Sequence, residues 1–321
     1  MSYAQNGLAQ ASDFNTLIQG YANGALNTGA ASLNLVWSSG NQNKGYGQTG
    51  IAIETTGNAI VATSKWNSLV ANTANAASHQ GSSITSVAAP VTNGVVTYLS
   101  AIPTNLTTIY NNRLNAAAQG STTTNTATYG TTWSDKLTFI HTVSFANGNA
   151  ARYFFNSGGQ LAITATHPSG TGINLLLNNL AANIGTVVLS SPTTGTVTIG
   201  GVSYSGVTKI GGGGNSPTIS QNSGYYALTT ANANIFYQTA STGPSGYLST
   251  NVNVLVKSNG TQGASGDAGS IITIYTIWDE IPNGLTASTG SATTVTVRPP
   301  STSYISNTWG AFTVTGTVSG A

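Results

Sequence analysis

Between residues 137 and 318 the sequence is divided into short stretches that alternate apolar and polar residues and are separated by turn-forming residues. Such alternation places apolar side chains on one face of a strand. We therefore expect strands at 137–145, 161–164, 187–190, 196–200, 202–204, 225–230, 235–238, 251–257, 271–278, 293–298 and 312–318. The stretch 271–278 is apolar on both faces, which predicts a central strand. Residues 173–183 could instead form a short helix that ends at Gly185. This density of strands and turns is typical of an antiparallel β-sandwich or a jelly-roll-like domain.

The segment 136–166 is predicted to be an antiparallel meander within this domain. Asn147-Gly148 is a strong hairpin signal between two alternating stretches. The meander would place Arg152 on a strand, next to Tyr153, Phe154 and Phe155. A strand arginine among aromatic residues could stack on a ring, pair with a carboxylate across an interface, or extend to solvent at a sheet edge.

Helical periodicity dominates the first third of the chain. Residues 11–26 repeat apolar residues at three- and four-residue spacing, with Ser12 as the expected N-cap. The pattern Ser-x-[Phe/Trp]-Asn-[Ser/Thr]-Leu-[Ile/Val] occurs around Phe14 and again around Trp66. The second copy predicts a helix that ends at His79-Gln80-Gly81. Phe14 and Trp66 are therefore expected to be equivalent buried anchors of an internal repeat.

A third helical stretch covers residues 94–118. Val95, Leu99, Ile102, Leu106 and Ile109 form an apolar seam at three- and four-residue spacing. Pro103 predicts either a kink or the start of a new helix. The Ser/Thr-rich segment from Gly120 to Thr132 has no periodicity and marks a domain boundary. The expected fold is α+β, with a helical region at 1–119 and a β-sandwich domain at 120–321.

Charge is unusually scarce, since only 4% of the residues are Asp, Glu, Lys or Arg, against about 25% in typical soluble proteins. An uncharged polar surface costs little to desolvate and lacks the net charge that keeps monomers apart, so both effects favour an assembled protein. The eight basic residues do not cluster, which argues against nucleic acid as a partner. No signal peptide and no membrane-spanning stretch is visible.

The residues that could carry chemistry are few. Asp279 and Glu280 are adjacent on a strand and would point to opposite faces, unlike the facing carboxylates of a glycosidase. The three histidines lack metal-ligand spacing, and His141 is expected to be a hydrogen-bonded core or interface residue. The sequence therefore predicts no catalytic residue, no cofactor and no metal site.

Several motifs resemble virion structural proteins of tailed bacteriophages, in the neck, collar and fibre class. They are Arg-Tyr-Phe-Phe-Asn-Ser-Gly-Gly at 152–159, the paired [Phe/Trp]-Asn-x-Leu helices, Gly-Tyr-Gly-Gln at 45–48 and Ala-Ser-His-Gln-Gly at 77–81. The resemblance implies a non-enzymatic protein that is made in the host cytoplasm and located in the virion. Its partners would be other virion proteins and copies of itself, with a trimer favoured.

The residues expected to serve packing and assembly are Phe14, Trp66, Leu99, Ile102, Leu106, Ile109, Arg152, Phe154 and Phe155. Two other functions stay open. One is a carbohydrate-binding adhesin tip that stacks exposed Tyr and Trp on host surface glycan. The other is a capsule depolymerase with carboxylates brought together from distant positions.

Overall fold

The computed structural model describes residues 11–19, 21–22, 25–26, 31–39, 45–55, 63–89, 101–242, 247–262, 269–279, 281 and 284–320. The chain forms two compact units, and its fold is α+β. The first unit comprises Met1–Ala118 and Ser301–Thr308, and the second comprises Gln119–Pro300 and Trp309–Ala321. The segment Ser301–Thr308, which we had expected in the β-domain, thus belongs to the helical unit.

The helical unit contains α1 (Ala11–Gln19), α2 (Leu33–Val36), α3 (Thr63–Gln80) and α4 (Ala101–Asn111), with a short hairpin of β1 (Tyr21–Ala22) and β2 (Ala25–Leu26). The helix α3 ends where predicted, because Gly81 adopts a left-handed φ of 70°. No helix among the described residues is long and apolar enough to cross a membrane.

Two expectations for the first helix are wrong. It stops at Gln19 rather than at residue 26, and the β1–β2 hairpin follows it. Ser12 is not its N-cap, because α1 already includes Ala11. Ser12 instead lies in the first turn, where its carbonyl accepts a hydrogen bond of 2.8 Å from the Thr16 hydroxyl. A serine at this position caps a helix only if the helix starts after it.

The helical unit holds its extended segments through side-chain amides. Asn15 donates from Nδ2 to the Glu54 carbonyl at 2.9 Å and accepts from the Glu54 N–H at 2.8 Å. The same two-bond arrangement, which we call an amide clamp, joins Asn34 to Ile51, Asn105 to Thr85, and Gln48 to Ser306. Each clamp satisfies the backbone N–H and C=O of one residue that lies outside the described strands.

The seam of the third helical stretch is buried inside its own unit. Ile102, Leu106 and Ile109 are buried in α4, which packs against α2 and α3. Pro103 lies in α4, two residues after the first described residue of that helix. Residues 90–100 lie outside the described ranges, so the kink and the new helix both stay predictions. Val95 and Leu99 lie outside the described residues.

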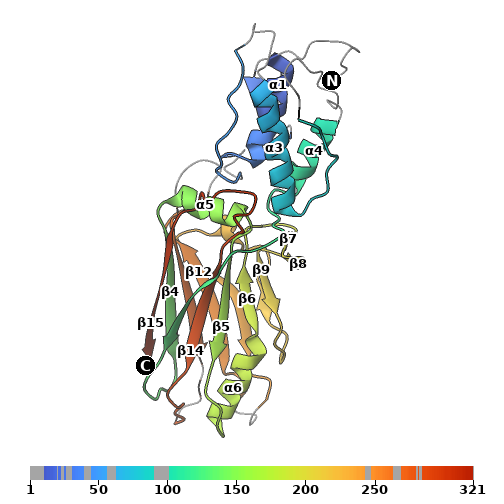
Figure 1. The fold of residues 1–321 in the computed structure, drawn as a ribbon. Coiled ribbons are helices and arrows are strands. Elements are labelled where there is room, and N and C mark those ends of the chain that lie inside the picture. Colours follow the sequence, from blue (N-terminus) through green and yellow to red (C-terminus); the bar gives the residue numbers. More distant parts are fainter. Residues whose placement is uncertain are drawn as a thin grey trace. The chain divides into compact units, whose positions relative to one another are not determined.

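The second unit is a sandwich of two antiparallel sheets, shown in Figure 1. The six-stranded sheet has the order β10 (Thr218–Ile219), β11 (Ala233–Thr239), β12 (Asn251–Ser258), β13 (Ile271–Asp279), β4 (Leu137–Phe145) and β15 (Phe312–Gly320). The five-stranded sheet has the order β3 (Thr123–Thr128), β14 (Ala292–Arg298), β5 (Gln160–Thr166), β6 (Thr186–Leu189) and β9 (Val207–Ile210). A separate hairpin joins β7 (Val197–Ile199) to β8 (Val202–Tyr204).

Most strands lie where the alternation predicts, and β13 is an inner strand between β12 and β4. Its outer face is only half-buried, so it is not enclosed on both sides. Two predictions failed here. The boundary segment 120–132 contains β3, and the expected strand 225–230 is instead a 3-10 turn, η2 (Tyr225–Ala227). The predicted helix after residue 173 is α6 (Ile173–Ile184), with Gly185 at its C-cap.

The expected meander at 136–166 is wrong at its centre. Residues Gly148–Asn156 form a helix, α5, rather than the second strand of a hairpin. Asn147 is its N-cap, and its side chain accepts a hydrogen bond of 2.9 Å from the Ala150 N–H. The strands before and after α5 belong to different sheets, so α5 carries the chain from one layer to the other. Figure 1 shows α5 and α6 at opposite ends of the sandwich.

Candidate assembly surfaces

The repeat anchors Phe14 and Trp66 contact each other. Their ring centroids are 5.0 Å apart at an interplanar angle of 68°, and both side chains are buried. The two copies of the repeat differ at the next residue. Asn15 forms an amide clamp, whereas the Oδ1 atom of Asn67 is buried without a hydrogen-bond partner among the described residues. The repeat therefore provides one shared aromatic core rather than two separate sites.

The residues of the 152–159 motif build the end of the sandwich core around α5. The Phe154 ring lies 5.1 Å from Phe145 and 6.0 Å from Phe312, measured between centroids. Phe155 stacks on Tyr225 at 4.2 Å. All of these rings except Phe312 are fully or nearly fully buried. Phe154 and Phe155 are thus core residues: Phe154 packs α5 against β4 and β15, and Phe155 packs it against η2.

The polar members of the motif also have structural positions. Asn156 accepts a hydrogen bond of 2.6 Å from the Tyr226 hydroxyl. Gly158 has a left-handed φ of 93°, which ends the helix. At Gly159 a Cβ atom would lie 2.5 Å from the Phe154 ring, so only glycine fits without displacement. The motif therefore encodes a capped helix that is closed tightly onto its own aromatic ring.

Arg152 lies on α5 rather than on a strand, and it is buried, so it does not extend to solvent at a sheet edge. Its positive charge acts on Tyr225. Burial raises the pKa of the Tyr225 hydroxyl well above its ordinary value, and the neighbouring Tyr226 adds to this, while Arg152 opposes the shift. The structure thus assigns Arg152 to the interior of the β-unit.

A chain of hydrogen bonds connects Ser291, His167 and Asn174. The Ser291 hydroxyl is 2.8 Å from His167 Nδ1, and His167 Nε2 is 3.0 Å from Asn174 Oδ1. Trp133 donates to the same hydroxyl at 2.9 Å, and the Ser288 N–H donates to Asn174 Oδ1 at 2.8 Å. Asn174 Oδ1 can only accept, so the proton of the neutral imidazole is on Nε2 and Ser291 donates to Nδ1.

This arrangement has the residue types of a catalytic triad, but Ser291 is fully buried. Its oxygen already accepts from an indole, so no substrate carbonyl can reach it. Burial also lowers the pKa of His167, although the Asn174 hydrogen bond opposes that shift. These hydrogen bonds form a neutral structural network. Sequence reasoning could not find it, because its members are far apart in sequence.

His141 is fully buried between the sheets, and burial lowers its pKa. A hydrogen bond with the backbone of Asn125 opposes that shift, although it is too long or too bent to count under strict distance and angle limits, which neither ring nitrogen meets with any described residue. A Cβ atom on Gly316 would lie 2.9 Å from His141 Nε2 and 2.4 Å from Asn125 Oδ1. Glycine at 316 therefore leaves room for the imidazole.

Two of the described carboxylates form ion pairs with lysine side chains. Glu54 pairs with Lys65 at 3.0 Å, and Asp279 pairs with Lys136 at 3.5 Å. Within the described ranges, no group of three or more His, Cys, Asp or Glu side chains could hold a metal ion. Glu280 and Asp267 lie outside the described residues.

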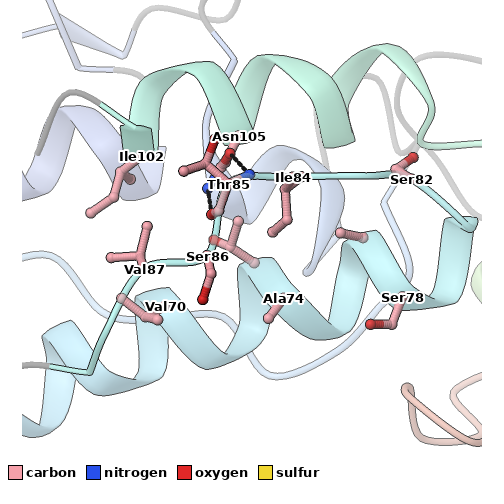
Figure 2. Close-up of a pocket in the computed structure, with 12 residues that line it drawn as sticks. Val70, Ala74, Ser78, Ser82, Ile84, Thr85, Ser86, Val87, Ile102 and Asn105 are labelled. Atoms are coloured by element: carbon pink, nitrogen blue, oxygen red, sulfur yellow. Dashed lines mark hydrogen bonds between the residues drawn. The ribbon is translucent and has the colours of Figure 1, made fainter. Parts of the chain in front are cut away.

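A cavity of about 330 Å³ lies in the helical unit between α3, α4 and the extended residues 82–87. Figure 2 shows Val70, Ala74, Ile84, Val87 and Ile102 around it, with the amide clamp of Asn105 on Thr85 at one side. Hydroxyl groups complete the lining, and none of the lining residues is charged. The cavity thus offers packing space but no acid–base chemistry.

All five tryptophans of the chain are buried. The only exposed large aromatic side chain among the described residues is Tyr304. The adhesin alternative relies on exposed Tyr and Trp rings as stacking platforms, and of these the described residues offer Tyr304 but no Trp.

One pair of sheet edges in the β-unit lacks the residues that usually protect an edge. β15 ends the six-stranded sheet, β3 ends the five-stranded sheet, and the two strands pack against each other. Neither strand contains a charged residue or a proline. Unpaired edges normally carry such residues as protection against association. These edges therefore offer free backbone groups to another chain.

Comparison of the chain with protein-family models, with curated proteins and with solved structures finds no match.

Proposed function

We propose that this protein is a non-enzymatic structural component of a tailed-phage virion, in the neck, collar or fibre class. It acts by symmetric assembly with copies of itself and with other virion proteins. The motifs at 11–18, 63–70 and 152–159 support the phage part of the proposal through their resemblance to that class. Host synthesis in the cytoplasm and location in the particle follow from the same resemblance.

The observation that carries the assembly part is the unprotected edge formed by β15. Nine residues of regular strand present backbone donors and acceptors, and the strand has no charge, no proline and a continuous register with β4. The scarcity of charge over the whole chain removes the repulsion that would oppose a second copy. A protein that functions as a free monomer normally protects such an edge with charged residues, proline or a β-bulge.

The structure also bears on how the proposed packing residues act. Phe14, Trp66, Ile102, Leu106, Ile109, Phe154 and Phe155 are buried inside single units. They would support assembly by making rigid units, while the contact surface itself is backbone edge and uncharged polar side chains. A rigid scaffold lowers the entropic cost of association.

The experiment is to locate the protein in purified phage particles. Peptide mass spectrometry of particles separated on a density gradient should find it at a fixed copy number relative to the major capsid protein. Antibody labelling in electron microscopy should place it at one position on the particle. Its presence in infected cells together with its absence from purified particles would refute the proposal.

The non-enzymatic part has its own test. Incubation with host capsule polysaccharide should release no reducing ends, and Asp279→Asn should change nothing. Steady release that is abolished by Asp279→Asn would instead support the depolymerase alternative.

A further inference from the structure

The outward-facing groups of β15 can be identified from the hydrogen bonds of its neighbours. The Phe145 N–H donates to the Ser270 carbonyl at 2.9 Å, so the odd-numbered residues of β4 bond to β13. In an antiparallel ladder the alternate residues bond to the opposite neighbour. The even-numbered residues of β4 therefore bond to β15.

The register between β4 and β15 then divides β15 into two sets. Ser144 pairs with Thr313 and Thr142 pairs with Thr315. The odd-numbered residues Thr313, Thr315, Thr317 and Ser319 thus use their backbone groups on β4. The even-numbered residues Phe312, Val314, Gly316, Val318 and Gly320 direct their N–H and C=O groups to the open edge.

The sequence of this edge is symmetric about its central residue. Residues 314–318 read Val-Thr-Gly-Thr-Val, and Gly316 is the midpoint of the strand Phe312–Gly320. An antiparallel pairing with a second copy, with a two-fold axis at Gly316, would use all nine residues. Val314 would then face Val318 of the other copy, Thr315 would face Thr317, and Thr313 would face Ser319.

We propose that β15 pairs with β15 of a second copy in this register, which joins two six-stranded sheets into one continuous sheet. The proposal rests on the self-assembly part of the proposed function and names its contact. Every residue on the open edge would exchange hydrogen bonds with its opposite residue. Val–Val and Thr–Thr cross-strand pairs are favourable on both faces.

The second copy is the occupant that this edge fits best, because the two-fold axis turns one short sequence into its own complement. Shifting the axis by one residue, to Thr315 or Thr317, would place a valine opposite Gly316 and would shorten the paired length. Only the register about Gly316 pairs valine with valine and keeps every hydrogen bond. A two-fold contact gives dimers, or assemblies built from dimers, rather than the trimer that the resemblance favours.

A charge-exchange experiment tests the register directly. Thr315 and Thr317 are exposed, and their β4 partners are Thr142 and Ile140, so charges at both positions meet none on the neighbouring strand. The double variant Thr315→Lys, Thr317→Lys would place like charges opposite each other twice. We expect its dimer to be roughly 10-fold weaker in native mass spectrometry of the full chain.

The matched variant is Thr315→Lys, Thr317→Glu, which places a lysine opposite a glutamate at both positions. It adds the same number of charges to the same surface and should dimerise at least as well as the wild type. Circular dichroism of both variants verifies that they are folded. Equal dimerisation of the two variants would overturn the proposed register.

The absence of cysteine in the chain permits a second measurement. The variants Thr315→Cys and Thr317→Cys should not form a disulfide when each is oxidised alone. When they are mixed, the two introduced thiols face each other and should give a covalent dimer. An oligomer without this disulfide would refute the β15 contact but leave the proposed function standing. A wild-type monomer at micromolar concentration would refute both the contact and self-assembly.

Discussion

Replacing Gly159 with alanine should destabilise the β-unit through one identifiable clash. The added Cβ would lie 2.5 Å from two carbons of the Phe154 ring and 2.6 Å from the Phe154 carbonyl oxygen. The ring has little room to move away, since Phe145, Phe155 and Phe312 surround it at centroid distances of 5.1 to 6.0 Å. The carbonyl belongs to α5 and moves only with the helix.

The magnitude follows from the cost of overpacking. Forcing an extra methyl group into a closed core costs about 1–3 kcal/mol, and contact with a backbone atom places this variant near the upper end. For a unit of this size each kcal/mol lowers Tm by about 2–4 °C. We therefore expect a loss of about 5–10 °C.

Two glycines provide matched controls. Gly158→Ala introduces strain through its φ of 93° and should cost about 1–2 kcal/mol. Gly130→Ala meets no atom within 4 Å and has an ordinary φ, so it should be neutral. Differential scanning calorimetry of the three variants gives the comparison. A Gly159→Ala protein as stable as Gly130→Ala would show that the packing around α5 is not as described.

Three further predictions concern other parts of the chain. Burial lowers the pKa of His141 in the folded state, so on acidification the unfolded state takes up the imidazole proton at a higher pH than the folded state does. The free energy of unfolding should therefore fall as pH drops below 6.5, by up to about 1.4 kcal/mol per pH unit. His141→Leu should reduce that loss in urea titrations, and an unchanged slope would contradict it. Phe14→Leu and Trp66→Leu should show a coupling of about 0.5–1.5 kcal/mol in a double-mutant cycle, and additive effects would mean that the rings do not interact. Asn105→Ala should speed hydrogen exchange at Thr85, because both clamp bonds are lost, whereas unchanged exchange would refute the clamp.

The sequence predicted the β-sandwich well because its alternation is long and regular. Each strand of the six-stranded sheet except the two-residue β10 was expected, and so was the helix α6 with its terminal Gly185. The hydrophobic period of two is a local property of the sequence, so it can be detected without knowing which strands pair with each other. Short strands such as β9 and β10 carry too few residues for the pattern to be visible.

The failure at α5 has a specific physical cause. Asn-Gly favours a hairpin turn, but asparagine is equally suited to cap a helix, and the following residues decide between the two. Ala151, Phe154 and Phe155 have the i, i+3, i+4 spacing of a helix face, and all three are buried. Aromatic residues have high β-propensity, but here the buried helical face of α5 outweighs that preference.

The candidate assembly surfaces were harder to predict from the sequence than the strands were. Apolar seams identify residues that are buried, and Ile102, Leu106 and Ile109 are buried within one chain. Whether a seam faces its own unit or another copy depends on the positions of distant helices. The edge position of β15 depends on strand order, which the alternation alone does not encode.

Sedimentation velocity of the full chain at micromolar concentration tests self-assembly without any variant. We expect a stable oligomer that persists on dilution across that range, with a mass that is a multiple of 32.4 kDa. A well-folded species that sediments as a single 32.4 kDa chain at every concentration would contradict it.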